Sequence, residues 1–431
     1  MKNGDAPVWI VQLAVGNMQL SAGAAICYHN STLNCWNYWR KGVEEAMKGK
    51  NKAMKMKFCA ALASAALVAS GGALTECARL FEADMRNGVI HGAAVVAGGV
   101  DGIDVSASWG WADAAHTIPM TTRTVIDMAS VTKVAAGVTS YLVAHARGKV
   151  DVDAPFTNYL SAYSAPLTRK VTIRDLANHR SGFGEADGKP RVYRDKDPQA
   201  MLRKLLSLPP AEPSPDRVAY SCRNYMLLGQ TFEAITGGGD AAFCRREIYL
   251  PAGMKDTSLG APLPSIERTR LAQTITTPSG GVISDPWARP LWAAGIATFN
   301  AGLFSTAEDM ARLMRVYLRG GVCDDGTRLF GAAEMALIAP SPTNTMEGAR
   351  TFGWMSYTDD LPKELFGTAL FHSGWSGQTV LFDLKRRRFA VVLTTRCGSY
   401  KRAKRHRFAA IGALMRENPE DIRQNVKGPG K

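Results

Sequence analysis

The chain has 431 residues, of which 46% are hydrophobic and 21% are charged, and its formal net charge is +14. This composition is typical of a globular protein and excludes disordered, fibrous and collagen-like chains. Much of the excess positive charge lies in residues 41–57 and 385–407. These runs lack the finger spacing, the RNP-like strand and the basic zipper of nucleic-acid-binding modules. The sequence therefore favours solvated basic faces and predicts no nucleic-acid partner.

The N-terminal region contains a segment with the layout of a secretory signal peptide. Residues 54–74 run from basic to apolar to small side chains, and the apolar part, 58–69, is too short to span a bilayer. Because signal peptides begin at the chain terminus, we interpret residues 1–53 as a doubtful extension, with the true start at Met54 or Met56. This predicts a periplasmic or secreted protein. The alternative is a cytoplasmic protein in which 58–69 is a buried Ala-rich helix.

Regular secondary structure is expected from Thr75 onward. Apolar spacing predicts a helix over 77–87, which ends at Gly88. Strands are expected at 93–97 and 103–109, because the Asp-Gly step between them favours a tight turn. Further helices are predicted at 130–147, 172–178, 198–207, 224–235, 241–249 and 306–318. The C-terminal part is predicted to contain β segments at 369–372, 379–383 and 389–395 and a last helix at 403–416.

Strands at both ends with helices between them predict an α/β (α+β) fold in one domain, 75–417. Its sheet lobe, about 75–115 and 350–417, is made by pairing the terminal segments, and a mostly helical lobe, about 116–349, is inserted. A cleft between the lobes is the expected active site. Residues 418–431 are expected to form a disordered tail.

The first candidate motif is Ser-x-x-Lys at the start of an apolar helix, with Ser130 and Lys133 on the same helical face. Serine needs a neighbouring base, and lysine can serve if burial or nearby cations depress its pKa. The helix N-terminus favours a developing oxyanion beside the serine. Taken alone, the pattern also fits an N-cap serine followed by an exposed lysine.

Several framework strings accompany this motif: Arg147–Pro155, Thr172–Leu176, Gly253–Thr257 and Ala301–Ala307. With Ser130–Lys133, they make the sequence from Thr75 to the last helix resemble the serine β-lactamase and penicillin-binding-protein superfamily, on its class C branch. The resemblance implies a β-lactamase/DD-peptidase-like fold, an antiparallel sheet flanked by helices with an inserted helical lobe. It also implies that Ser130 is the nucleophile and Lys133 its proton partner.

The family's second motif, Tyr-x-Asn, corresponds here to Tyr220-Ser221-Cys222. The resemblance implies that Tyr220 shares protons with the nucleophile and the leaving group. Cys222 stands where the family has an asparagine that contacts substrate and lysine. Because a thiol is a weak donor and acceptor, substrate positioning by Cys222 is expected to differ from the family pattern.

The third motif corresponds to His372-Ser373-Gly374, a His-x-Gly variant on the strand that lines the cleft. The resemblance assigns substrate contacts to this strand and the oxyanion hole to the N–H groups of Ser130 and Trp375. Gly374 is expected to let substrate approach the backbone. His372 either contacts substrate or only holds the strand, and its ring could hydrogen-bond Tyr220. Histidine in place of lysine reduces positive charge at neutral pH, which weakens the case for efficient β-lactam hydrolysis.

The resemblance implies a serine hydrolase that acts through an acyl-enzyme on amide, ester or lactam carbonyls. A D-Ala-D-Ala-type carboxypeptidase or other D-amino-acid peptidase is favoured slightly over an esterase, and the substrate is then a muropeptide, an ester or a β-lactam. The alternatives are a true β-lactamase and a non-catalytic peptidoglycan-binding relative. Eight cysteines without a CxxC pair and seven scattered histidines predict no disulfide scaffold, metal or cofactor, and the sequence leaves the oligomeric state open.

Overall fold

The computed structural model describes residues 9–15, 18–24, 72–183, 197–210, 218–275, 277, 279–340 and 348–416. The first two ranges form an antiparallel pair of strands, β1 (Trp9–Val15) and β2 (Met18–Ala24). Residues 54–71 of the signal-like segment and the expected tail at 418–431 lie outside the described residues. In the part of the chain that the structure describes, no helix is both long and apolar enough to cross a membrane.

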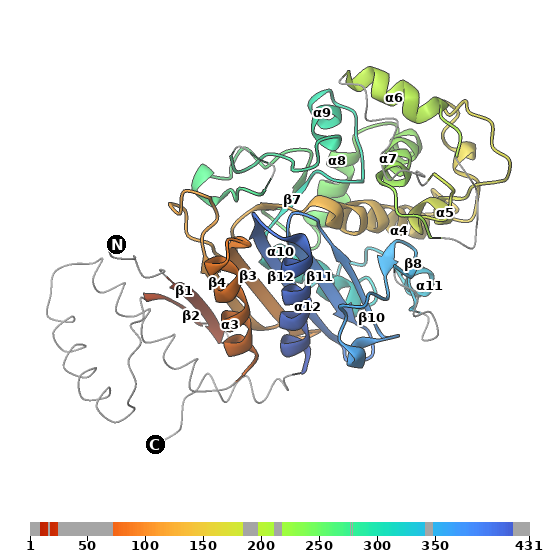
Figure 1. The fold of residues 1–431 in the computed structure, drawn as a ribbon. Coiled ribbons are helices and arrows are strands. Elements are labelled where there is room, and N and C mark those ends of the chain that lie inside the picture. The colour runs from red at the N-terminus through yellow and green to blue at the C-terminus, as the bar shows by residue number, and fades with distance from the viewer. Residues whose placement is uncertain are drawn as a thin grey trace, which may run out of the picture.

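A seven-stranded antiparallel sheet forms the centre of the fold (Figure 1), with the strand order β4-β3-β12-β11-β10-β9-β8. Its strands are β3 (Ile90–Gly99), β4 (Ile103–Gly110), β8 (Arg350–Thr351), β9 (Trp354–Met355), β10 (Ala369–Ser373), β11 (Gln378–Asp383) and β12 (Arg388–Arg396). β3 pairs with β12, with Val95 opposite Val392. Segments from the two ends of the domain therefore share one sheet, and the predicted fold class is confirmed.

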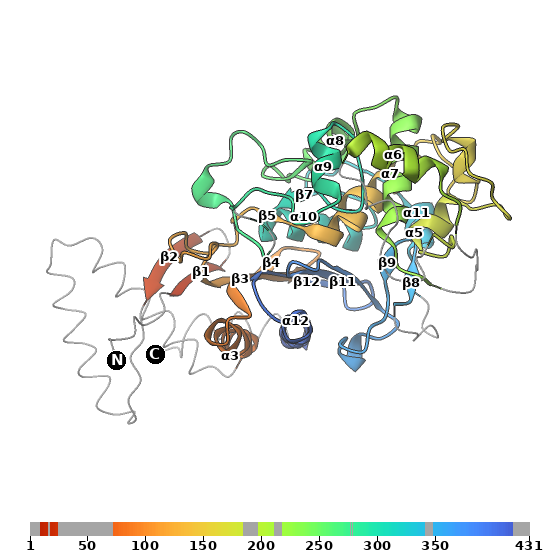
Figure 2. The same ribbon diagram turned by 45° about the horizontal axis from the view of Figure 1, so that its top comes forward.

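Helices cover both faces of this sheet, which explains why its central strands are apolar along their whole length. Alternate residues of β3 enter two different cores, because successive side chains point to opposite faces. Ala94 and Val96 pack in the core of the helical lobe, whereas Val95 packs in the core formed with α3 (Ala73–Arg86) and α12 (Tyr400–Arg416). Figure 2 shows α3 and α12 together on one face and the helical lobe on the other.

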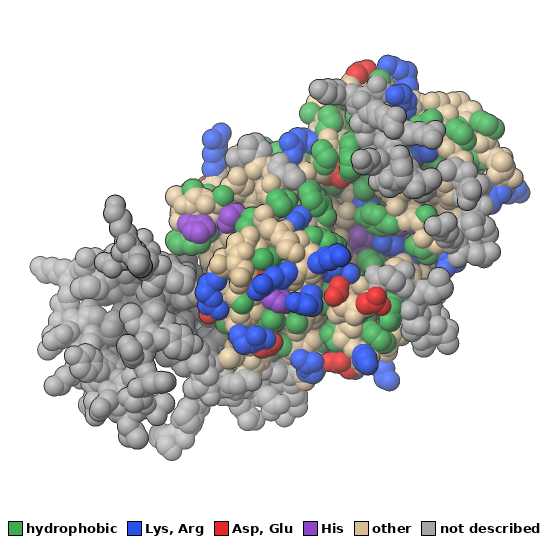
Figure 3. All heavy atoms as spheres, viewed as in Figure 1, with side chains coloured by type: hydrophobic (Ala, Val, Ile, Leu, Met, Phe, Trp, Pro, Cys, Tyr) green, Lys and Arg blue, Asp and Glu red, His purple; other side chains and the backbone are tan. Residues whose placement is uncertain are grey.

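The basic run near the C-terminus lies on the first half of α12. Arg402 pairs with the buried carboxylate of Asp84 at 2.8 Å, and Lys404 pairs with Asp360 at 2.9 Å. Lys and Arg side chains gather on the surface over this helix (Figure 3). The opposite, apolar side of the helix is buried against the sheet through Phe408, Ile411 and Leu414.

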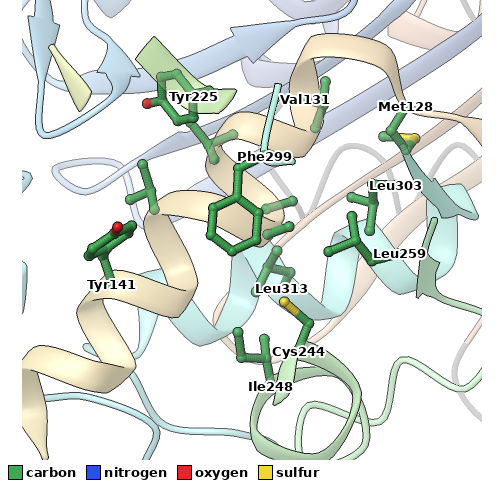
Figure 4. Close-up of a cluster of buried hydrophobic side chains, with 14 of the residues drawn as sticks. Met128, Val131, Tyr141, Tyr225, Cys244, Ile248, Leu259, Phe299, Leu303 and Leu313 are labelled. Atoms are coloured by element: carbon green, nitrogen blue, oxygen red, sulfur yellow. The ribbon is translucent and has the colours of Figure 1, made fainter. Parts of the chain in front are cut away.

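The helical lobe contains α4 (Thr139–Ala146), α5 (Ile173–Ala177), α6 (Pro198–Ser207), α7 (Cys222–Thr236), α8 (Asp240–Cys244), α9 (Ala288–Ala293), α10 (Ala307–Leu318) and α11 (Ala332–Leu337). Phe299 lies in the middle of its core, with Val131, Tyr141 and Tyr225 around it (Figure 4). Gly137 allows this packing, because a Cβ there would lie 3.1 Å from the Cβ of Phe299.

Some elements differ from the sequence-based expectations. The helix expected over 130–147 begins as a 3-10 turn, Ala129–Val131, and a π-helical turn, Lys133–Val138, before α4 starts. Such π-helical turns are frequent at functional sites. The strands β1 and β2 were not expected, because residues 1–53 were interpreted as a doubtful extension. Other elements that were not expected are short: α9, α11, β8, β9 and a three-stranded sheet of β5 (Ile126–Asp127), β7 (Leu303–Ser305) and β6 (Ser258–Leu259). Strands of two or three residues are too short to carry a hydrophobic period.

Candidate active site

Ser130 lies in a strained turn that follows β5. The preceding residue, Ala129, has a φ of +44°, a conformation that costs a non-glycine residue roughly 1–3 kcal/mol. Two hydrogen bonds hold the turn. The Met128 N–H donates to the carbonyl oxygen of Leu303 at 2.8 Å, and the Thr132 hydroxyl donates to the carbonyl oxygen of Ala129 at 2.6 Å. The serine hydroxyl is therefore presented from a fixed backbone.

Lys133 is fully buried and directed at this hydroxyl. Its Nζ donates to the Oγ of Ser130 at 2.9 Å and to the backbone carbonyl oxygen of Asn300 at 2.8 Å. The Sγ of Cys222 lies 3.7 Å from the same nitrogen. The amine is thus held by one contact from its own helix and by two from other segments of the lobe.

The pKa of Lys133 differs in direction from the expectation. Burial lowers the pKa of Lys133, but Cys222, Tyr220 and the carboxyl group of Asp285 outweigh burial, and the pKa lies above its ordinary value. The condition under which a lysine serves as a base, a depressed pKa, is therefore not met at Lys133. The physical reason is that the groups nearest the amine are acceptors and acids, not cations. Lys133 is consequently an ammonium ion at neutral pH and donates to Ser130.

Tyr220 approaches Ser130 from the α7 side, and its phenol donates to the serine Oγ at 2.9 Å. The side chain is 49% exposed, so it borders the open side of the group. Its neighbour Ser221 caps α7 by accepting a hydrogen bond from the Arg223 N–H at 3.2 Å. The structure therefore brings Ser130, Lys133 and Tyr220 into one hydrogen-bonded group, although Tyr220 is 90 residues from Ser130 in sequence.

Cys222 is the first residue of α7, and its sulfur faces Lys133. Burial raises the pKa of the Cys222 thiol, although the charge of Lys133 opposes this effect. The thiol is therefore neutral at neutral pH. A neutral thiol offers one weak donor and one weak acceptor, so it does not supply the hydrogen bonds of an asparagine amide.

His372 is buried at the end of β10, on the sheet side of the site. Its Nδ1 lies 3.1 Å from the carbonyl oxygen of Ser373, and within the described residues its Nε2 has no hydrogen-bond partner. The expected bond to Tyr220 is therefore absent from this part of the chain. Burial, with Arg350 and Lys133 nearby, holds the pKa of His372 well below its usual value, so the ring is neutral.

Ser373 and Gly374 fix the end of the same strand. The Ser373 hydroxyl is 3.0 Å from the hydroxyl of Thr379 on β11. A Cβ on Gly374 would lie 2.7 Å from the carbonyl oxygen of Met128, closer than real Cβ contacts allow. The absence of a side chain therefore lets the strand end lie against the turn that carries Ser130, and the approach of substrate at Gly374 stays an expectation.

Trp375 follows this glycine and is 39% exposed. Its carbonyl oxygen accepts a hydrogen bond from the Arg396 Nε at 2.6 Å, and the guanidinium lies 4.7 Å from the indole ring. Among the described residues, the N–H group of Trp375 donates to no backbone group, so this amide remains available beside the close contact at Gly374.

Three residues that no motif indicates also belong to the site. The ring of His179, just after α5, lies 4.6 Å from the Tyr220 ring, and the guanidinium of Arg350 on β8 lies 5.3 Å from the same ring. Asn300 supplies the carbonyl acceptor for Lys133. Only Asn300 had a nearby signal, because it immediately precedes the framework string that begins at Ala301.

No group of three or more His, Cys, Asp or Glu side chains in the described part of the chain could hold a metal ion. The chemistry that this arrangement can perform rests on a hydroxyl, an ammonium group and a phenol. A serine placed between an amine and a phenol is suited to nucleophilic attack with proton transfer.

The chain is similar to several known proteins. The Beta-lactamase family model matches residues 77–414. A "Putative D-alanyl-D-alanine carboxypeptidase" of Escherichia coli O157:H7 is 28% identical over 303 residues, which cover 62% of this chain and 68% of that protein. A penicillin-binding protein homologue from Caulobacter crescentus has a TM-score of 0.64 at 20% identity, covering 79% of this chain and 97% of that one. A class C β-lactamase from Rhodobacter sphaeroides has a TM-score of 0.61 at 20% identity, covering 78% and 99%.

Proposed function

Because the chain belongs to the β-lactamase family, we propose that it is a serine hydrolase in which Ser130 forms an acyl-enzyme. The observation that carries the proposal is the hydrogen-bonded group around this serine. The ammonium group of Lys133 and the phenol of Tyr220 each lie 2.9 Å from the Ser130 Oγ. An N-cap serine beside an exposed lysine has neither a buried amine nor a phenol at its hydroxyl.

In the proposed reaction, the Lys133–Tyr220 pair first loses one proton to solvent. The Ser130 Oγ then forms a bond to the substrate carbonyl carbon while its proton passes to the vacant position of this pair. The electron pair of the carbonyl bond moves to oxygen, where the N–H groups of Ser130 and Trp375 stabilise it. The carbonyl then re-forms, and the bond to the leaving group breaks as the pair returns the proton to that group. Water releases the acyl group by the same steps. One oxyanion-hole donor contributes about 2.7–4 kcal/mol to such a reaction.

For the substrate, we propose a peptide ending in D-Ala-D-Ala, or another D-amino-acid peptide, with a short-chain ester as the second candidate. The name of the Escherichia coli relative supports the first. The ester is favoured by one observation: His372 is neutral and buried where a lysine would offer a positive charge to a substrate carboxylate. A periplasmic or secreted location, expected from residues 54–74, stays a prediction.

The proposal is tested by intact-mass spectrometry after exposure to a penicillin, a D-Ala-D-Ala thioester and short p-nitrophenyl esters. We expect a mass increase equal to one acyl group, located on the peptide that contains Ser130, and no increase in the Ser130→Ala variant. The substrate that acylates and turns over fastest identifies the substrate class. An equal mass increase in the Ser130→Ala variant would show that another nucleophile acts.

A further inference from the structure

The ammonium group of Lys133 donates to two oxygen atoms and has only a weak third contact. Its Nζ donates to the Oγ of Ser130 at 2.9 Å and to the backbone carbonyl oxygen of Asn300 at 2.8 Å. The third contact is with the Sγ of Cys222 at 3.7 Å, and a thiol sulfur is a weak acceptor. Lys133 is fully buried, and a buried charge without its full set of hydrogen bonds costs free energy.

Asn300 carries a buried amide whose hydrogen-bonding capacity is unused. The residue is completely buried, and within the described residues neither its Oδ1 nor its Nδ2 has a hydrogen-bond partner. Most buried side-chain polar atoms in proteins have a partner, so an unpartnered amide needs an explanation. Lys133 needs a strong third acceptor, and an unpartnered acceptor belongs to the residue that it already contacts.

The carboxyl group of Asp285 gives this amide a direction. Its Oδ1 accepts hydrogen bonds from two backbone N–H groups at the start of α9, at 2.7 and 3.0 Å, so the carboxyl group is fixed in place. Burial raises the pKa of Asp285 and the pKa of the Cys222 thiol, and the Asn300 amide opposes burial at both groups. A group that favours the negative form of both neighbours presents its N–H₂ donor to them. The acceptor Oδ1 is then available to Lys133.

The position of Asn300 answers the departure from the family motif at Cys222. The resemblance places at Cys222 an asparagine that contacts both lysine and substrate. Asn300 comes from a different segment, just before β7, and reaches the same amine through its backbone carbonyl oxygen. Because Asn300 is completely buried, its amide can replace the contact to Lys133 but not the contact to substrate.

We propose that Asn300 is a positioning residue whose side-chain amide takes over the contact to Lys133 that the motif loses at Cys222. This inference rests on the proposed function and deepens it, because it names the side chain that keeps the amine directed at Ser130. A side-chain rotation lets the Oδ1 of Asn300 accept the third hydrogen of the ammonium group, while its Nδ2 donates to the carboxyl group of Asp285.

A double-mutant cycle between Asn300 and Cys222 tests the inference through the rate of acylation by a p-nitrophenyl ester. Asn300→Ala should lower this rate by about 10- to 100-fold, the value of one hydrogen bond to a charged group. In the Cys222→Asn background, which restores the motif amide, the same replacement should cost less than about threefold. Gly374→Ala is the matched control, because its added Cβ meets the Met128 carbonyl and not Lys133. Its loss should be equal in both backgrounds.

A second cycle needs no substrate. In urea unfolding, Asn300→Ala should raise the equilibrium constant for unfolding about tenfold more in the wild type than in Lys133→Met, because the Lys133→Met variant has no ammonium group for the amide to bind. Asn300→Leu, which has a similar shape and no polar atoms, takes the place of Asn300→Ala if that variant does not fold.

The two cycles separate this inference from the proposed function. A loss of acylation in Asn300→Ala that Cys222→Asn restores supports the inference. Equal losses in the two Cys222 backgrounds overturn it, and so does a wild-type acylation rate in Asn300→Ala. If the wild-type protein is never acylated at Ser130, the proposed function fails, and the unfolding cycle still decides whether Asn300 holds Lys133. Equal effects of Asn300→Ala in the wild type and in Lys133→Met overturn the inference in that case.

Discussion

The ammonium group of Lys133 and the backbone carbonyl oxygen of Asn300 are joined by a hydrogen bond of 2.8 Å inside the helical lobe. The same segment also holds the serine turn, because the N–H of Leu303 donates to the Thr132 hydroxyl at 3.1 Å. One stretch of chain around β7 therefore fixes both the amine and the backbone that carries Ser130. The distance between hydroxyl and amine is set by tertiary contacts in addition to helical spacing.

Lys133→Met is expected to separate catalysis from stability. The acylation rate should fall by about 10²–10⁴-fold, because the ammonium group that stabilises the serine oxygen is lost. The free energy of unfolding should change by less than about 2 kcal/mol, because an apolar side chain of similar length replaces a buried charge. Stopped-flow labelling by a fluorescent penicillin and urea unfolding measure the two quantities. Unchanged acylation would show that Lys133 is only a buried structural cation.

Cys222→Asn tests the departure from the family motif. The amide would replace a weak thiol donor with a full one beside Lys133, so kcat/KM for a D-Ala-D-Ala peptide should rise about tenfold, the value of one additional hydrogen bond of about 1.4 kcal/mol. Cys222→Ser, with a single hydroxyl, is the control and should give a smaller change. A lower kcat/KM in Cys222→Asn would mean that the site is adapted to the sulfur, and that a different substrate fits it.

The three motif segments could be located from the sequence because each has a fixed local pattern. Ser130 and Lys133 share one helical face, Tyr220 precedes a capped helix, and His372 ends an apolar strand. The pairing of the terminal strands could also be predicted. Strands occur at both ends of the domain with helices between them, and such strands find their hydrogen-bond partners by joining one sheet. These features depend on short-range patterns that the residues themselves carry.

The remaining parts of the site depend on contacts that form only in the folded chain. Arg350 and His179 reach Tyr220 because β8 and the end of α5 meet at the same place, and no local pattern marks either residue. The raised pKa of Lys133 has the same origin, because its cause is the acids and acceptors that surround the amine. Gly374 likewise has its role through the backbone of Met128, which is distant in sequence.

His372→Gln should reduce the loss of stability in acid. Burial, Arg350 and Lys133 hold the folded-state pKa of His372 well below its usual value. The unfolded chain therefore takes up a proton below about pH 6.5 that the folded protein does not, so this contribution is complete above about pH 6.5 and is lost as the pH falls. The free energy of unfolding should therefore fall less steeply with decreasing pH in the variant, by up to about 1.4 kcal/mol per pH unit. Urea unfolding between pH 7 and pH 5 measures it.

Equal slopes in wild type and His372→Gln would mean that His372 is already charged in the folded protein. In that case a positive charge would be available on β10 for a substrate carboxylate, and the preference for peptides over esters would strengthen.

Gly374→Ala tests whether the close contact between the β10 end and the serine turn sets the oxyanion hole. The added Cβ would lie 2.7 Å from the carbonyl oxygen of Met128, so the two segments must separate. We expect a loss of about 1–3 kcal/mol of stability from this overpacking. Because the Trp375 N–H moves away from the Ser130 N–H, the acylation rate should fall by about 10²–10³-fold, as when one oxyanion donor is lost.

Gly102→Ala is the matched control, because a Cβ on Gly102 would meet no atom within 4 Å and its φ is not positive. The comparison separates two effects of the Gly374 variant. If stability falls but acylation by a p-nitrophenyl ester stays at the wild-type rate, the Trp375 N–H is not an oxyanion donor, and the site must stabilise the negative charge from another direction. The added Cβ would also meet the side-chain oxygen of Gln378. If both fall together, the packing of the β10 end against Gln378 and the Ser130 turn aligns the two amides.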